Sequence, residues 1–207
     1  MTAGGGAAGE ARPAAPVSRH TAHREDVRRA IHAASGALGP LALWLPWRGA
    51  GGALLGGLAV LAIVLETARR ASPSLQRLVT GAAGALFRPD EERALSGPTV
   101  LVCGYAAAWA LFSPRTAALA IVVAAVADPA AALVGRRLAR GPGKSWAGSA
   151  ACAATAAVVI AAAGAGGLAT AAGAVAAALA ERAPWRGADN LLVPVAVGAA
   201  LSVVRPG

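Results

Sequence analysis

Acidic, aromatic and sulfur-containing residues are scarce in this chain of 207 residues. Ten Asp and Glu stand against nineteen Lys and Arg, and aromatic residues make up 4% of the chain. The two cysteines, Cys103 and Cys152, lie in apolar runs without metal-ligand spacing, so we interpret them as small core residues. What the chain has instead is 57% hydrophobic and only 14% charged residues. A soluble domain of this length is more polar, so the composition indicates a membrane protein.

Apolar runs rich in Ala, Gly, Leu and Val recur along the chain. Crossing a bilayer as a helix takes about 20 residues, and several runs approach this length. We therefore predict an all-α fold, a polytopic transmembrane helical bundle with about seven spans. Some runs are short, so tilted, re-entrant or extended segments, and a count one lower or one higher, are alternatives. The predicted spans are residues 31–46, 50–66, 97–112, 115–127, 148–163, 167–180 and 190–204.

The distribution of charge predicts the orientation and the domain organisation. We expect residues 1–24 to form a disordered cytoplasmic tail and residues 25–207 to form a single integral domain of the cell membrane. With the N-terminus in the cytoplasm, only Arg48, Arg115 and Arg205 of the nineteen basic residues lie outside. All acidic residues then fall on the cytoplasmic side, where we expect the chemistry. The net charge of +9 is mainly this positive-inside signal, so we predict no nucleic-acid partner. Its surplus suits anionic headgroups or a phosphorylated ligand.

Asp128 directly follows the fourth predicted span. Pro129 can occupy the first turn of a helix, so one interpretation is that Asp128 only caps a helix that begins there. Along that helix Asp128, Ala131, Ala132 and Gly135 share one face, on which the side chains around the acid are very small. A ligand can therefore approach closely. A phosphate with Mg²⁺ is the natural candidate, because this ion is usually held by one or two carboxylates together with phosphate oxygens.

A basic, glycine-rich loop follows this helix. It carries positive charge of the kind that a triphosphate requires, from Arg136, Arg137, Arg140 and Lys144. A solvated positive-inside loop is the alternative. The triplet Gly143-Lys144-Ser145 is not a nucleotide-binding P-loop, because Leu138 stands where that pattern needs a glycine. The backbone amides of the loop can still cradle a phosphate.

Three further polar clusters are expected on the same face. Each has a simpler interpretation: Glu66 can pair with Arg69 and Arg70 at helical spacing, Asp189 can cap its helix, and His32 can be an interfacial histidine. The order of the clusters along the chain argues for a shared role. They are Arg28, Arg29 and His32; Glu66, Arg69 and Arg70 followed by Arg88, Asp90 and Glu91; and Asp189, Asn190 and Pro194.

These motifs, in this order, resemble the polyprenol kinase family, which includes phytol kinase, dolichol kinase and CTP-dependent diacylglycerol kinase. A more distant similarity is to phosphatidate cytidylyltransferases. The resemblance covers about residues 25 to 204. It rests on Arg28-Arg29-x-x-His32, on Arg88-Pro89-x-Glu91 ahead of Gly97, on Asp128 with Gly135, Arg136 and Arg137, on Lys144-Ser145 with Gly148, and on Asp189-Asn190 with Pro194.

The resemblance implies transfer of the terminal phosphoryl group of CTP to the hydroxyl of a membrane isoprenoid alcohol of the phytol, dolichol or polyprenol type. It implies that Asp128 and Asp189 hold Mg²⁺, and that Asp128 and Lys144 are catalytic. Glu91 or His32 would accept the proton of the hydroxyl. The nucleotide phosphates would be bound by Gly135, Arg136, Arg137, Lys144, Ser145 and Gly148.

One position departs from the family pattern. The family has Lys-Ser/Thr-x-Glu-Gly, whereas this chain has Ala147 in place of the Glu. If that Glu binds metal or acts as a base, activity here is weakened, moved to another acid or lost. The alternatives are therefore a cytidylyltransferase-like nucleotidyltransferase, or a non-catalytic homologue that binds a lipid or a partner protein. The particular lipid, the nucleotide base and the oligomeric state are left open.

Overall fold

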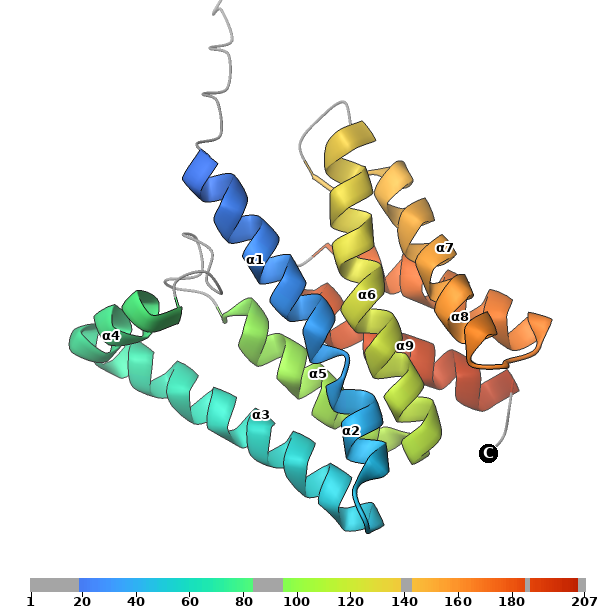
Figure 1. The fold of residues 1–207 in the computed structure, drawn as a ribbon, viewed down its shortest axis with the longest axis horizontal. Coiled ribbons are helices and arrows are strands. Elements are labelled where there is room, and N and C mark those ends of the chain that lie inside the picture. The colour runs from blue at the N-terminus through green and yellow to red at the C-terminus, as the bar shows by residue number, and fades with distance from the viewer. Residues whose placement is uncertain (1–18, 84–94, 139–142, 185–186, 205–207) are drawn as a thin grey trace, which may run out of the picture.

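The computed structural model describes residues 19–83, 95–138, 143–184 and 187–204. Its regular structure is α-helical throughout these ranges, with no strand, which confirms the predicted all-α class. Figure 1 shows how the helices follow one another. They are α1 (Arg19–Ser35), α2 (Leu38–Trp44), α3 (Arg48–Ala71), α4 (Pro73–Ala83), α5 (Gly97–Leu111), α6 (Pro114–Leu138), α7 (Trp146–Ala162), α8 (Gly167–Glu181) and α9 (Ala188–Val204).

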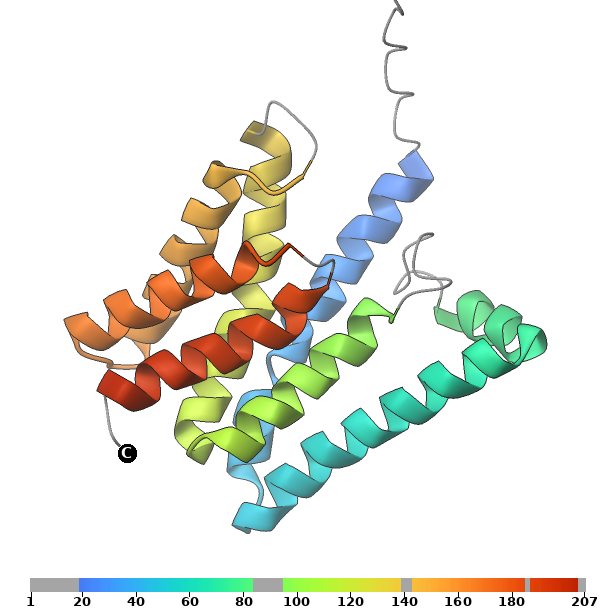
Figure 2. The same cartoon turned by 180° about the vertical axis from the view of Figure 1, so that it is seen from behind.

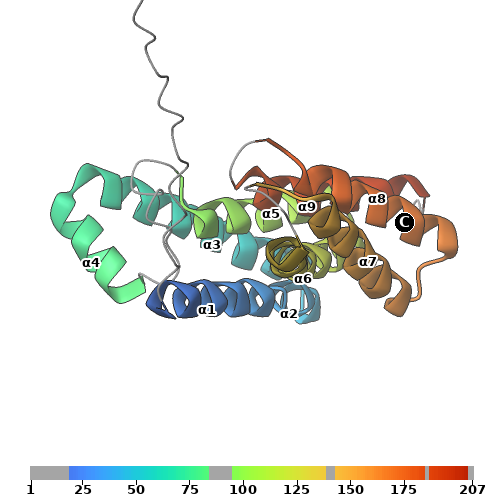
Figure 3. The same ribbon diagram turned by 90° about the horizontal axis from the view of Figure 1, so that it is seen from above.

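Helix α6 is the centre of the bundle. It contacts α1, α2, α5, α7, α8 and α9. Figure 3 shows α1 and α2 on one side of α6, and α5 and α9 on the other. Figure 2 shows α5, α9 and α8 side by side on the far face. Ala120, Ala124 and Ala127 of α6 are buried, and such small side chains let neighbouring helices approach closely.

Two of the described helices have the length and apolarity needed to cross a membrane. They cover Gly49–Ala71 and Pro114–Leu138, whereas the other apolar helices are shorter. Helix α3 also exposes a run of large apolar side chains, including Val60, Leu61 and Val64. Spanning by all seven predicted segments stays a prediction.

Several predicted boundaries were wrong. The predicted span 31–46 is divided between α1 and α2, because the chain turns at Gly36, where a Cβ would lie only 2.7 Å from the Ala125 Cβ of α6. Helix α1 begins at Arg19, so residues 19–24, which we expected in a disordered tail, are helical. Helix α4 was not predicted at all.

The interpretation of Asp128 as a helix cap was also wrong. Helix α6 continues through Pro129 to Leu138, so Asp128 lies inside it rather than at a helix start. A proline inside a helix removes one backbone hydrogen bond. Buried contacts of α6 on both sides of this point, such as those of Ala127 and Ala131, offset that loss.

A buried polar cluster joins the end of α3 to the start of α5. Glu66 is 4% exposed, and its carboxylate accepts hydrogen bonds from Arg69 at 2.6 and 3.0 Å and from Arg70 at 2.8 Å. This confirms the pairing expected from helical spacing. Ser96, before α5, donates to the same carboxylate at 2.8 Å, and Thr99 approaches it at 3.4 Å. The cluster therefore holds two helices together through a charge that would otherwise be costly to bury.

Gly104 lies where α5 packs on α9, so a substitution at this position tests that packing. A Cβ at this position would meet the main-chain oxygen of Asn190 at 2.4 Å and Leu191 Cα at 2.9 Å. Gly104→Ala should therefore force the two helices apart and cost about 1–3 kcal/mol of unfolding free energy. Gly56→Ala in α3 is the control, because a Cβ there meets nothing within 4 Å and alanine favours a helix by about 0.5–1 kcal/mol. Thermal unfolding in detergent, followed by circular dichroism, measures both. Equal melting of Gly104→Ala and Gly56→Ala would contradict this packing.

Candidate functional site

A cavity of about 620 Å³ lies at the end of the bundle where α6 ends and α7 begins. This volume is within the usual range for small-molecule sites, about 300–1,000 Å³. Helices α1, α6, α7, α8 and α9 contribute to its lining, as do the start of α5 and the segment before α7. Segments far apart in the sequence therefore meet in one place.

The α1 side of the cavity is a network of guanidinium and carboxylate groups. Arg28 donates to Glu25 at 2.9 Å, and Arg29 donates to Glu25 at 3.0 Å and to Asp26 at 3.1 Å. Arg136 of α6 lies 3.9 Å from Asp26. Burial, and next the nearby charge of Arg136, lowers the pKa of Arg29 below its ordinary value. An added negative charge beside Arg29 and Arg136 would therefore be stabilised.

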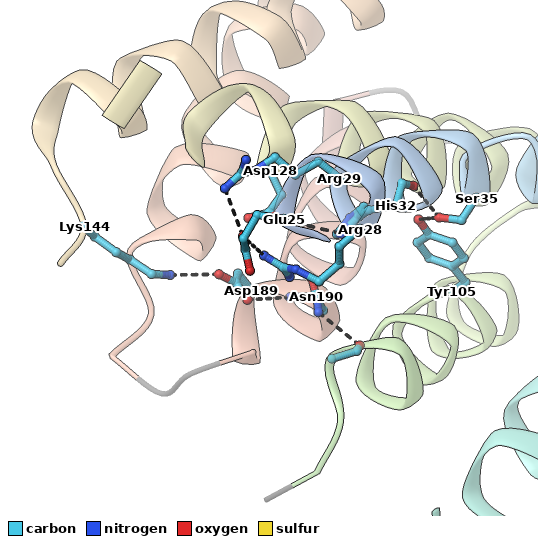
Figure 4. Close-up of polar contacts among 11 residues, drawn as sticks. Glu25, Arg28, Arg29, His32, Ser35, Tyr105, Asp128, Lys144, Asp189 and Asn190 are labelled. Carbon is cyan, nitrogen blue, oxygen red and sulfur yellow. Dashed lines mark hydrogen bonds and ion pairs between the residues drawn. The ribbon is translucent and has the colours of Figure 1, made fainter. Parts of the chain in front are cut away.

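His32 and Asp128 face each other beside this network. The His32 Nδ1 and Asp128 Oδ2 atoms are 3.7 Å apart, and the Asp128 side chain is 28% exposed. Asp128 is therefore accessible from the cavity while it faces an imidazole. Figure 4 shows the Tyr105 hydroxyl nearby, in a 2.9 Å hydrogen bond with Ser35 Oγ, which joins α5 to the end of α1.

Lys144 extends across the opposite part of the lining toward α9 (Figure 4). Its ammonium donates to Asp189 Oδ2 at 3.1 Å and to the main-chain oxygen of Glu181. Gly143, just before it, has φ of 103°, a left-handed conformation that favours glycine. The other Asp189 oxygen accepts from the main-chain N–H of Asn190 at 3.0 Å, and the Asn190 amide donates to the Gly97 oxygen at 3.1 Å. These bonds connect the loop before α7 with α9 and α5.

Small residues bring α6 and α7 together at the cavity. A Cβ on Gly148 would lie 3.0 Å from the Ala131 oxygen, and one on Gly135 would lie 3.1 Å from Ser145 Oγ. Ala131, Ala132 and Gly135 all line the cavity, together with Asp128. The predicted face of small residues beside the acid is therefore confirmed, although the helix that carries it is longer than expected.

Most of the predicted site residues line this one cavity. Arg137 is exposed near the end of α6 and is not among the described residues of the lining. Pro194 is buried in α9 close to Gly104, so the structure gives it a role in packing. Arg88 and Glu91 lie outside the described residues. The predicted residues in the lining are Arg28, Arg29, His32, Asp128, Gly135, Arg136, Lys144, Ser145, Gly148, Asp189 and Asn190.

Glu181 is a residue of the site that the sequence did not predict. This residue ends α8 and lines the cavity, yet it is only 6% exposed. Its carboxylate accepts a hydrogen bond from Ser149 Oγ at 2.8 Å. The available signal was a single acid that closes a long run of Ala, Leu and Val, because a carboxylate in such a place needs partners from elsewhere in the fold.

The carboxylates of the cavity fit Mg²⁺ only together with a ligand. Among the described residues, no three His, Cys, Asp or Glu side chains are placed to hold an ion by themselves. Asp128 and Asp189 both line the cavity and provide hard oxygen donors. Mg²⁺ commonly takes one or two carboxylates and completes its shell with phosphate oxygens and water. The donor set therefore suits a metal that arrives with a phosphate.

Comparison with known proteins gives no match to a family model, to a curated protein or to a solved structure. The class of the protein therefore follows from its geometry. It is an all-helical protein in which an apolar bundle carries a cavity lined by both signs of charge.

Ser145 has a structural role that can be separated from ligand binding. Its Oγ accepts a hydrogen bond from the Gly148 N–H at 3.0 Å, as the N-cap of α7. Ser145→Ala should cost about 1 kcal/mol of unfolding free energy, whereas Ser145→Asp should restore the cap. The aspartate adds negative charge to the cavity lining, so it should also weaken the binding of inorganic tripolyphosphate in the presence of Mg²⁺. Unfolding curves and calorimetric titration measure the two effects. If Ser145→Asp bound tripolyphosphate as well as the wild type, the cavity would not be the anion site.

Proposed function

We propose that this protein is a multi-pass membrane kinase that transfers the terminal phosphoryl group of CTP to the hydroxyl of an isoprenoid alcohol of the phytol, dolichol or polyprenol type. The single observation that carries the proposal is the convergence of motifs. Arg28, Asp128, Lys144 and Asp189 are far apart in the sequence, yet they line the same cavity. These four residues belong to the motifs on which the resemblance to the polyprenol kinases rests.

The distribution of exposed residues supports a membrane setting. Helices α3 and α6 have spanning length, and the four shorter apolar helices α5, α7, α8 and α9 would cross with them. The end of α1 together with α2 would form the seventh span. Trp44 and Trp47 are 92% and 64% exposed at the junction of α2 and α3, at the other end of the bundle from the α6–α7 junction (Figure 1). Exposed tryptophans are typical of the membrane interface. In this arrangement the cavity faces the cytoplasm.

The mixed charge of the cavity supports a metal nucleotide as the ligand. The described lining includes the acids Glu25, Asp128, Glu181 and Asp189 and the bases Arg28, Arg29, Arg136 and Lys144. Many of these groups already form ion pairs, so a bare anion would have to displace a carboxylate from its partner. A nucleotide that carries Mg²⁺ brings charge of both signs and can satisfy acids and bases together.

The residues can be given roles in such a reaction. Asp128 and Asp189 would hold the metal, which neutralises phosphate charge when it is bound. Lys144, Arg29 and Arg136 would stabilise the charge that spreads over the transferred group. Gly135 and Gly148 leave room for phosphates near the ends of α6 and α7.

The chemical step requires a group that receives a proton. The lipid oxygen forms a bond to the terminal phosphorus, the bond from that phosphorus to the bridging oxygen breaks, and CDP leaves. The hydroxyl proton passes to the imidazole of His32, and the carboxylate of Asp128, 3.7 Å away, stabilises the resulting positive charge. Of the two proton acceptors expected from the sequence, His32 lines the cavity, and Glu91 lies outside the described residues.

Ala147 supports a second candidate, a non-catalytic relative. The first turn of α7 has no acidic residue, so the site lacks a carboxylate at the position where the family has one. A cytidylyltransferase-like reaction is the rival within enzymes. That reaction releases pyrophosphate, whereas the kinase reaction releases CDP.

Transfer of label from γ-labelled CTP tests the kinase directly. Membranes that contain the protein are given prenols of several lengths or diacylglycerol, with γ-labelled ATP in parallel. We expect labelled prenyl phosphate, and we expect Asp128→Asn to lower its formation at least about 100-fold while the protein still inserts into membranes. Labelled pyrophosphate without labelled lipid would indicate nucleotidyl transfer. Full activity of Asp128→Asn would remove the proposed role of this acid.

The charge pairing also predicts that metal and nucleotide bind together. The dissociation constant of CTP, measured by calorimetry in detergent, should be at least about tenfold lower with Mg²⁺ than with EDTA. Lys144→Met should weaken binding with Mg²⁺ by about tenfold, because it removes a cation from the lining. Equal affinity for metal-free CTP would contradict a ligand that must satisfy both signs of charge.

A further inference from the structure

Glu181 is a buried acid whose partners come from other segments of the chain. It is 6% exposed at the end of α8, and Ser149 Oγ of α7 donates to its carboxylate at 2.8 Å. Arg182 donates to the same Ser149 oxygen at 3.3 Å. The Lys144 ammonium lies 4.0 Å from Glu181 Oε1. A carboxylate this deeply buried is stable only with such partners, so its position is fixed.

Two groups of Glu181, its main-chain oxygen and its carboxylate, interact with Lys144. Its ammonium donates to the Glu181 main-chain oxygen and forms an ion pair with the Glu181 carboxylate, while Asp189 takes a further hydrogen bond at 3.1 Å. An ammonium has three N–H donors, and two of them are directed at the Glu181 main-chain oxygen and at Asp189 Oδ2. Lys144 is also the only lysine in the chain, since the other eighteen basic residues are arginines. A compact, single point charge is therefore kept at this position of the cavity.

Glu66 is a useful comparison, because it is a similarly buried acid with a purely structural role. It is 4% exposed, against 6% for Glu181, and it too accepts a serine hydrogen bond at 2.8 Å, from Ser96. Its cations, Arg69 and Arg70, lie on its own helix. Glu66 does not line the described cavity, whereas Glu181 and its cation both do. The difference points to a role for Glu181 in the site.

We propose that Glu181 is a positioning residue that fixes the Lys144 ammonium in the cavity, where it meets the transferred phosphate. The inference rests on the proposed kinase function and deepens it. The Glu181 carboxylate, anchored through Ser149, also brings an acid to the beginning of α7, where Ala147 provides none. In this site the acid is therefore provided by the end of α8 and not by the beginning of α7.

The single lysine allows a test that needs no activity. Reductive methylation with ¹³C-formaldehyde labels Lys144 and the N-terminal amine, which have separate NMR signals. We expect Glu181→Gln to raise the methylation rate of Lys144 by about tenfold, because the ammonium loses its ion pair and moves more freely. Ser149→Ala should raise the rate by about threefold, since it keeps the charge but frees the carboxylate. Glu66→Gln is the matched control, and its rate should equal that of the wild type.

Steady-state kinetics separate positioning from folding. Glu181→Gln should lower kcat per folded molecule by about tenfold and change KM for CTP by less than about threefold, because the cavity keeps its cations but Lys144 is misplaced. Glu66→Gln should lower the melting temperature and leave kcat unchanged. A kcat for Glu181→Gln equal to that of the wild type would overturn the proposal.

The two proposals fail in different ways. If the wild type transfers no phosphate to any lipid, the kinase function is wrong, and the methylation rates still decide whether Glu181 holds Lys144. If Lys144 in Glu181→Gln is methylated at the wild-type rate, the positioning role is wrong even in an active kinase. Should Glu181→Gln fail to fold, Ser149→Ala decides: a wild-type rate and kcat in that variant overturn the proposal.

Discussion

Close packing of small side chains around α6 is the constraint on which the rest of the structure depends. Alanines such as Ala120 and Ala124 are fully buried there, and glycines on the neighbouring helices meet α6 almost at backbone distance. Large side chains would separate α1, α7 and α9 from this helix. Their polar residues would then no longer share a cavity. The many alanines therefore allow segments that are distant in the sequence to come together in one site.

The same packing raises the free-energy cost of holding charged groups in the site. Close packing partly buries the ionised groups at the cavity, so partners of opposite charge stabilise them. The structure provides such partners in pairs that cross between elements, such as Lys144 with Asp189 and Arg136 with Asp26. Pairing stabilises these charges, and it favours the proposed metal nucleotide, which carries both signs of charge.

Helical periodicity predicted the part of the site that lies on one helix. Residues at helical spacing lie on the same side of a helix wherever that helix begins. Asp128, Ala131 and Gly135 were therefore correctly grouped on one face, although α6 continues through Pro129. Local propensity failed at that proline because tertiary contacts outweigh one lost hydrogen bond. Glu181 was missed for a different reason: Lys144 and Ser149 are more than thirty residues away, and no local pattern reports such a contact.

The single lysine also divides the chain. Lys144 stands between α6 and α7, so a protease that cleaves only after lysine has one cleavage site in the sequence, and it lies at the boundary between α1–α6 and α7–α9. Each fragment would retain part of the cavity lining, with Asp128 on one and Asp189 on the other. The site is thus formed jointly by the two parts of the polypeptide that meet at Lys144.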